Sequence, residues 1–96
     1  MVKIIVGYKR KEGIDIQPLL MKLRSAAITY PGFISAENLV SNRDNSIVFT
    51  LYTWDSIPKW HLWENAIIRK KILQEAEPML CDQPRVRTYQ ILPTTR

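Results

Sequence analysis

The chain has 96 residues, of which 46% are hydrophobic and 24% are charged, and these values are ordinary for a globular domain. No apolar run approaches the roughly 18 residues that a membrane-spanning helix needs, and the first residues lack the pattern of a signal peptide. The one cysteine, Cys81, excludes an internal disulfide and a cysteine-based metal site. We therefore expect one cytoplasmic domain over residues 1–96, with no membrane partner and no metal.

The net charge of +5 comes largely from basic segments at residues 9–11, 69–71 and 85–87. Such segments would attract an anion: an acidic substrate, a haem propionate or a nucleic acid. The sequence has neither the aromatic motif of a ribonucleoprotein nor a zinc-finger spacing, so we expect no nucleic-acid partner. We interpret the segments as solvated surface. Residues 69–71 are expected in the second half of a helix, where cations are favoured.

The first third of the chain predicts a strand and a helix. Residues 2–9 are rich in β-branched and aromatic side chains, which favour a strand. Asp15 can cap a helix that has Pro18 in its first turn, and apolar residues then repeat at helical spacing. The turn at residues 30–32 ends this helix, because the residue before a proline avoids helical dihedrals and a glycine permits a sharp bend.

The middle of the chain predicts a hairpin that leads into a long helix. Residues 33–40 and 47–54 read as strands, and the polar turn at residues 42–45 joins them as an antiparallel pair. Asp55 and Ser56 are both good N-cap types, so a helix is expected from about residue 57 to residue 76, before a proline ends it. A last strand is expected over residues 86–92.

The long helix carries a broad apolar face and one histidine. At about 100° per residue, five side chains share that face: Trp60, Trp63, Ala66, Ile67 and Leu73. His61 lies about 100° away from Trp60, so we expect it at the flank of this face or in solvent.

The order of the predicted elements is βαββαβ. This order indicates an α+β, ferredoxin-like fold, with a four-stranded antiparallel sheet and two helices on one face. The strand over residues 47–54 is apolar on both faces, with Ile47, Phe49 and Leu51 on one and Val48, Tyr52 and Trp54 on the other. The helices cover only one face, so the sequence predicts a homodimer that packs sheet against sheet.

Four segments together resemble the antibiotic biosynthesis monooxygenase superfamily. They are Tyr30-Pro-Gly-Phe-Ile-Ser-Ala-Glu37, Ile47-Val-Phe-Thr-Leu-Tyr-Thr-Trp-Asp-Ser56, Trp60-His-Leu-Trp63 and Arg85-Val-Arg-Thr-Tyr-Gln-Ile91. The resemblance covers nearly the whole chain and implies a dimeric α/β barrel. The superfamily includes cofactor-free oxygenases, haem-degrading enzymes, small decarboxylases or isomerases, and members without known activity, so the resemblance leaves the reaction open.

The haem-degrading branch of this superfamily pairs a helix tryptophan with a histidine ten positions later, and has an asparagine in the first strand. Trp63 matches the tryptophan, but the position of the iron ligand is Leu73 and the first strand has no asparagine. Haem is therefore disfavoured, and we expect no cofactor.

The cofactor-free branch oxidises electron-rich phenols or quinols in a pocket that excludes water. The resemblance implies a cofactor-independent monooxygenase that acts on a small aromatic or quinol-like compound. The candidate pocket residues are Trp63, Trp60, Phe33 and Leu73, and the candidate catalytic groups are His61, Tyr8 and Tyr52. Two alternatives stay open: a dimer that binds haem or another small ligand without catalysis, and a structural dimer in which the tryptophans are only core.

Overall fold

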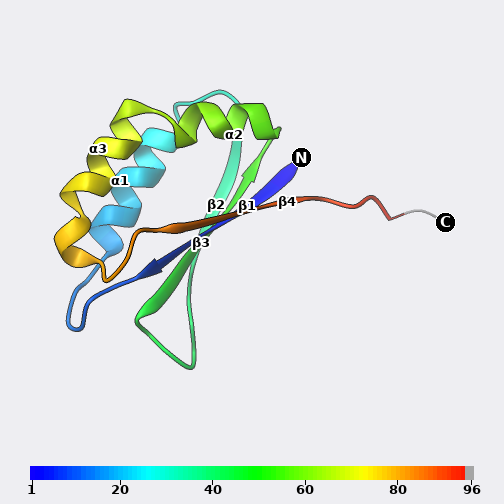
Figure 1. Ribbon diagram of the computed structural model, residues 1–96. Coiled ribbons are helices and arrows are strands. Elements are labelled where there is room, and N and C mark those ends of the chain that lie inside the picture. Colours follow the sequence, from blue (N-terminus) through cyan, green and yellow to red (C-terminus); the bar gives the residue numbers. More distant parts are fainter. Residues whose placement is uncertain (95–96) are drawn as a thin grey trace.

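Four strands form one antiparallel sheet in the computed structural model, which describes residues 1–94 (Figure 1). The strands are β1 (Val2–Lys9), β2 (Phe33–Val40), β3 (Ile47–Trp54) and β4 (Arg85–Gln90), in the spatial order β2-β3-β1-β4. The helices are α1 (Gln17–Ala27), α2 (Ile57–Glu64) and α3 (Ile67–Glu75), and a short 3-10 turn, η1 (Glu77–Met79), follows α3. All three helices lie on one face of the sheet (Figure 1). The α+β, ferredoxin-like arrangement is thus confirmed.

The prediction of one long helix over residues 57–76 is wrong, because this segment forms two helices, α2 and α3. Residues 1–94 therefore contain three α-helices rather than the two expected. Asn65 ends α2, and its side chain donates a hydrogen bond of 2.9 Å to the carbonyl oxygen of His61. Ala66 is extended, with φ −65° and ψ 138°. A side-chain amide that bonds the backbone competes with helix continuation. As a result Ile67, expected on the buried face, is 84% exposed.

The bounds of three strands match their predicted ranges, while β4 begins one residue early and ends two residues early. The first helix begins at Gln17, and Ile16 occupies the N-cap position with its side chain buried. Asp15 still acts at this end of the helix, because its Oδ1 accepts the backbone N–H of Gln17 at 3.0 Å. Within the described part of the chain, no helix is both long and apolar enough to cross a bilayer.

The core lies between the sheet and the helices. Alternate residues of β1 and β3 point into it, as the two-residue period of a strand requires, and α1 adds one apolar stripe. The buried apolar side chains from these three elements are Val2, Ile4, Val6, Tyr8, Val48, Tyr52, Trp54, Leu19, Leu20, Leu23 and Ala27.

The middle of the opposite face of the sheet, here called the outer face, is also apolar. Ile5, Phe49 and Leu51 are half-buried there, whereas Leu39 on β2 is 46% exposed and Tyr89 on β4 is 48% exposed. None of the helices in residues 1–94 lies on this face (Figure 1).

Candidate functional site

An aromatic cluster lies where α2 meets the sheet. Four rings contact one another edge to face or at a tilt, with centroids 5.6–6.4 Å apart: Phe33, Tyr52, Trp54 and Trp60. Tyr30 and Trp63 add a further edge-to-face pair at 5.2 Å, and the N–H of Trp63 lies near the hydroxyl of Tyr52. The three tryptophan side chains are fully buried. The closest pairs are Tyr30–Trp63 at 5.2 Å and Tyr52–Trp60 and Phe33–Trp54, both at 5.6 Å. Aromatic pairs of this geometry stabilise a fold beyond their buried area.

Two turns hold α2 against the sheet and so position this cluster. The backbone N–H of Asp55, before α2, donates to the carbonyl oxygen of Gly32, after α1, at 2.8 Å. Ser56 caps α2 by accepting from the N–H of Lys59 at 3.4 Å. Gly32 has φ +95°, and the side chain of Lys59 packs directly on it. Trp60, in the first turns of α2, is thereby placed over Tyr52.

The indole N–H groups of the cluster have no protein partner. In residues 1–94, the Nε1 atoms of Trp54, Trp60 and Trp63 are all buried without a hydrogen-bond acceptor. A buried donor without a partner costs about 1–3 kcal/mol, and such groups are rare in folded proteins. The cluster therefore contains three donors that an oxygen atom of a ligand can satisfy.

Two buried tyrosines add hydroxyl groups to this part of the core: that of Tyr52 lies beside the N–H of Trp63, and Tyr8 neighbours Tyr52. Burial raises the pKa of Tyr52 to about 12, and the pKa of Tyr8 is raised further by burial and by the neighbouring Tyr52. The N–H of Trp63 lies near the Tyr52 hydroxyl and favours its ionised form, although their geometry falls short of a hydrogen bond. Both phenols are neutral at pH 7, so they can donate hydrogen bonds but cannot act as general bases.

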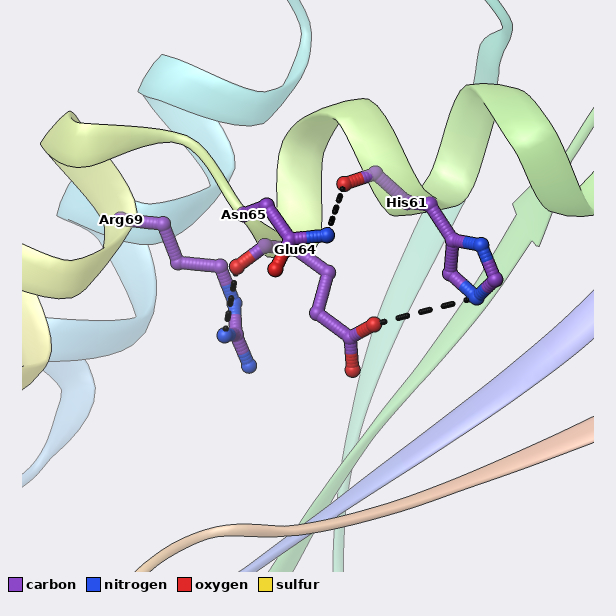
Figure 2. A network of polar contacts seen from close by, with 4 residues as sticks. All are labelled: His61, Glu64, Asn65 and Arg69. Atoms are coloured by element: carbon purple, nitrogen blue, oxygen red, sulfur yellow. Dashed lines mark hydrogen bonds and ion pairs between the residues drawn. The ribbon is translucent and has the colours of Figure 1, made fainter.

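One cation borders the cluster. Arg69 of α3 is half-buried, and its guanidinium carbon lies 5.8 Å from the centre of the Trp60 ring. Its Nη1 donates to the carbonyl oxygen of Glu64 at 3.2 Å, at the end of α2 (Figure 2). The positive charge counteracts the effect of burial on the pKa of Tyr52 and of Tyr8, so its field reaches both hydroxyls.

Two of the predicted site residues lie outside the cluster. The side chain of His61 is 54% exposed, and its Nε2 lies 4.0 Å from Oε1 of Glu64 (Figure 2). Leu73 packs at the edge of the core, beside a hollow that it shares with Leu80 and Cys81. The structure thus brings together Trp60, Trp63, Phe33 and Tyr52, with Tyr8 close by.

Solved structures share this architecture over nearly the whole chain. A crystal structure of an antibiotic biosynthesis monooxygenase superposes with a TM-score of 0.81 at 18% identity, covering 97% of this chain and 100% of that one. A candidate member from Deinococcus radiodurans gives 0.85 at 11% identity, covering 100% and 97%, and one from Nitrosomonas europaea gives 0.80 at 13%, covering 97% and 100%. The chain has the fold of the antibiotic biosynthesis monooxygenases. No family model and no curated protein matches its sequence.

The cluster of this monooxygenase-fold chain is closed in the observed conformation. Five hollows within residues 1–94 are lined by side chains outside the cluster, and the three indoles have no exposed surface. One hollow of about 390 Å³ lies on the outer face, over Ile5, Gly7 and Phe49, with Arg85 and Arg87 at its edge. No group of three metal-ligating side chains occurs within residues 1–94.

Sequence reasoning missed three members of the site. Trp54 is not among the candidate pocket residues of the sequence analysis, yet its ring lies 5.9 Å from that of Trp60. Tyr30 belongs to the turn that ends α1, and only its contact with Trp63 places it in the cluster. Arg69 was expected to be solvated, like its exposed neighbours Lys70 and Lys71. Its role depends on the break between α2 and α3, for which Asn65 is the only local signal.

Proposed function

We propose that this chain is a cofactor-independent monooxygenase that oxidises a small phenol or quinol at the aromatic cluster. The observation that carries the proposal is the set of three buried indole N–H groups without an acceptor, in the same core as the neutral hydroxyls of Tyr52 and Tyr8. The fold, which is that of the antibiotic biosynthesis monooxygenases, also supports an oxygenase function.

In this class of reaction the atoms and electrons balance without a cofactor. A phenol with a free ring position reacts with O₂ to give a quinone and water. One oxygen atom becomes the new carbonyl oxygen, the other leaves as water, and all the electrons come from the substrate. The protein must exclude bulk water, orient the ring and stabilise negative charge as it develops on oxygen.

The residues of the cluster fit these tasks. Trp60 and Trp63 provide apolar walls, and their N–H groups, together with the hydroxyls of Tyr8 and Tyr52, donate to the substrate oxygens. Entry of a ligand requires α2 to move, and the non-helical dihedrals of Asn65 and Ala66 separate α2 from α3 at the point where it would hinge. We assign no proton transfer to His61, because its side chain lies outside the cluster.

Oxygen consumption with a panel of hydroquinones tests this function. The wild-type chain is expected to consume O₂ and form a quinone that carries one added oxygen atom from O₂, while the other oxygen atom is released as water. Trp63→Phe keeps an aromatic ring but removes the N–H, and should lower the rate about tenfold, the effect of losing one hydrogen bond to developing charge. His61→Ala is the matched control on the same helix and should leave the rate unchanged. A rate unaffected by Trp63→Phe in a folded protein would refute the site.

The proposal includes no haem, because the donor set does not fit haem iron. The single histidine of the sequence points away from the cluster, and the raised pKa of both buried tyrosines disfavours the phenolate that an iron ligand would need. A haem titration followed by visible absorption is expected to show no saturable Soret band. A saturable band that decays with ascorbate would replace this proposal with haem degradation.

We further propose that a second copy of the chain covers the outer face. The register of the strands places a row of side chains across this face: Glu37 on β2, Leu51 on β3, Ile5 on β1 and Arg87 on β4. The row therefore has an acid at one edge, two apolar residues in the middle and a base at the other edge. A two-fold axis parallel to the strands lays Glu37 of each copy over Arg87 of the other. An axis perpendicular to the strands would oppose like charges.

Sedimentation at micromolar concentration should show a dimer. Glu37→Arg and Arg87→Glu should each weaken it at least tenfold, because two attractive pairs become repulsive and each exposed pair contributes about 0.2–1 kcal/mol. An equimolar mixture of the two variants should restore dimers, since every pair is then again of opposite charge. A monomeric wild-type chain would refute the dimer, and failure of the mixture to associate would refute the axis.

A further inference from the structure

We propose that Arg69 binds the ionised oxygen of the substrate, so that the site selects aromatic compounds that carry a phenolate. This inference rests on the proposed function of the aromatic cluster and specifies the charge state of the compound that enters it.

Arg69 is held in place by two contacts. Its Nη1 donates to the carbonyl oxygen of Glu64 at 3.2 Å, and its guanidinium carbon lies 5.8 Å from the ring centre of Trp60. In Figure 2 its side chain extends from α3 back toward the end of α2. The first contact also satisfies a carbonyl at the end of α2 that has no helical partner. Both contacts join the guanidinium to α2, the helix whose movement the proposed function requires.

The charge of Arg69 has no carboxylate partner. Within residues 1–94 the one ion pair found is His61–Glu64, and Arg69 contacts Glu64 through its backbone oxygen. A guanidinium has five N–H donors, and this hydrogen bond uses one of them. Charged side chains that are removed from water are normally paired, so a half-buried guanidinium without a carboxylate is poised to bind an anion.

The field of this guanidinium reaches the place where a ligand would lie. It favours the ionised forms of Tyr8 and Tyr52, which come from two different strands under the helices. A bound phenol would experience the same two opposing influences as these tyrosines: burial that disfavours ionisation and a nearby cation that favours it. Because a ligand can approach the guanidinium directly, as the tyrosines do not, the cation should dominate for the ligand.

The chemical class of the ligand follows from what surrounds the charge. The apolar faces of Trp60 and Trp63 suit an aromatic ring, while the unpartnered indole N–H groups suit an oxygen acceptor. A neutral or cationic aromatic compound would leave the guanidinium unpaired. Ionisation of the phenol transfers its proton to water, and the resulting phenolate gives up an electron more readily than the phenol does.

Binding of 4-nitrophenol tests the inference without any turnover, because its ionisation is visible by absorption and it does not react readily with O₂. In complex with the wild-type chain it is expected to ionise at lower pH than free in solution. Arg69→Gln should abolish this shift and weaken binding of the phenolate at least tenfold. Arg69→Lys, which keeps the charge, should retain part of both effects. Lys70→Gln makes the same charge change on an exposed neighbour and should behave as wild type.

The outcomes separate this inference from the proposed function. Wild-type protein that does not bind 4-nitrophenol, or binds it without shifting its ionisation, overturns the role of Arg69 even if hydroquinones are oxidised. Equal binding by Arg69→Gln does the same. A shift that depends on Arg69, in a protein that consumes no O₂, supports the phenolate site and refutes the oxygenase.

Discussion

Replacement of Gly32 by alanine tests whether the turn after α1 holds α2 in place. A Cβ atom at this position would lie 2.5 Å from Cβ and 2.8 Å from Cγ of Lys59, much closer than van der Waals contact, so the turn or α2 must move. Gly32 also has φ +95°, in a region where a side chain costs about 1–2 kcal/mol. Overpacking typically adds about 1–3 kcal/mol. We therefore expect Gly32→Ala to lower the free energy of unfolding by about 2–5 kcal/mol.

Gly13 provides the matched control. It also has positive φ, +76°, but an added Cβ would meet no atom within 4 Å. Gly13→Ala should therefore cost only the conformational part, about 1–2 kcal/mol. Urea denaturation of both variants measures the difference, which isolates the contact with Lys59. Equal losses of stability in the two variants would refute the argument, because they would show that α2 shifts freely and is not positioned by this turn.

Three smaller effects follow from the local structure. Ser56→Ala should lower the free energy of unfolding by about 0.5–1 kcal/mol in urea denaturation, since the cap of α2 is a long hydrogen bond. Ionisation of Tyr52 should not change the free energy of unfolding below about pH 10, the pKa of a tyrosine in the unfolded chain. Above this pH the free energy of unfolding should fall, because folded Tyr52 keeps its proton up to a pKa of about 12. A spectrophotometric titration of the folded protein measures this pKa. The pKa of Asp44 is lowered first by a hydrogen bond from the side chain of Ser46 and then by one from its backbone. The stability that these hydrogen bonds contribute is lost as the pH falls through the pKa of folded Asp44. Ser46→Ala should raise the pKa of Asp44, which an NMR titration measures.

The sheet was predictable because its signals are local. The strands β1 and β3 are runs rich in β-branched and aromatic residues, and β2 lies between the turn at residues 30–32 and the polar turn at residues 42–45. The bounds of all three match the prediction. The break at Asn65 was not predictable from helical periodicity, because Asn65 ends α2 through a side-chain bond to the backbone that a pattern of apolar residues does not encode.

The site was only partly predictable for a similar reason. Helical periodicity alone places Trp60 and Trp63 on one apolar helix face, whereas Phe33 was a pocket candidate only through the family resemblance. Arg69 lies in a run of three cations, and nothing in the run distinguishes it from Lys70. Its contact with Trp60 exists only after α3 has turned away from α2.

Two of the four segments behind the family resemblance meet where α2 joins the sheet. The segment Pro31-Gly-Phe33 and the segment Trp54-Asp-Ser56 are joined by the hydrogen bond between Asp55 and Gly32, and the ring of Phe33 packs edge-on against Trp54 at 5.6 Å. These two segments together fix the position of α2 on the sheet. This explains why the resemblance predicts the fold well and leaves the reaction undetermined.

The aromatic cluster also provides an intrinsic fluorescence signal that is confined to one part of the protein. All three tryptophans of the sequence belong to it, and none lies on the outer face of the sheet. Indole emission depends on the polarity of the surroundings, and neighbouring indoles such as Trp54 and Trp60, 5.9 Å apart, exchange excitation energy. Intrinsic fluorescence should therefore report events under α2 and remain largely silent to association through the outer face, so that ligand entry and dimer formation can be followed separately in one unlabelled sample.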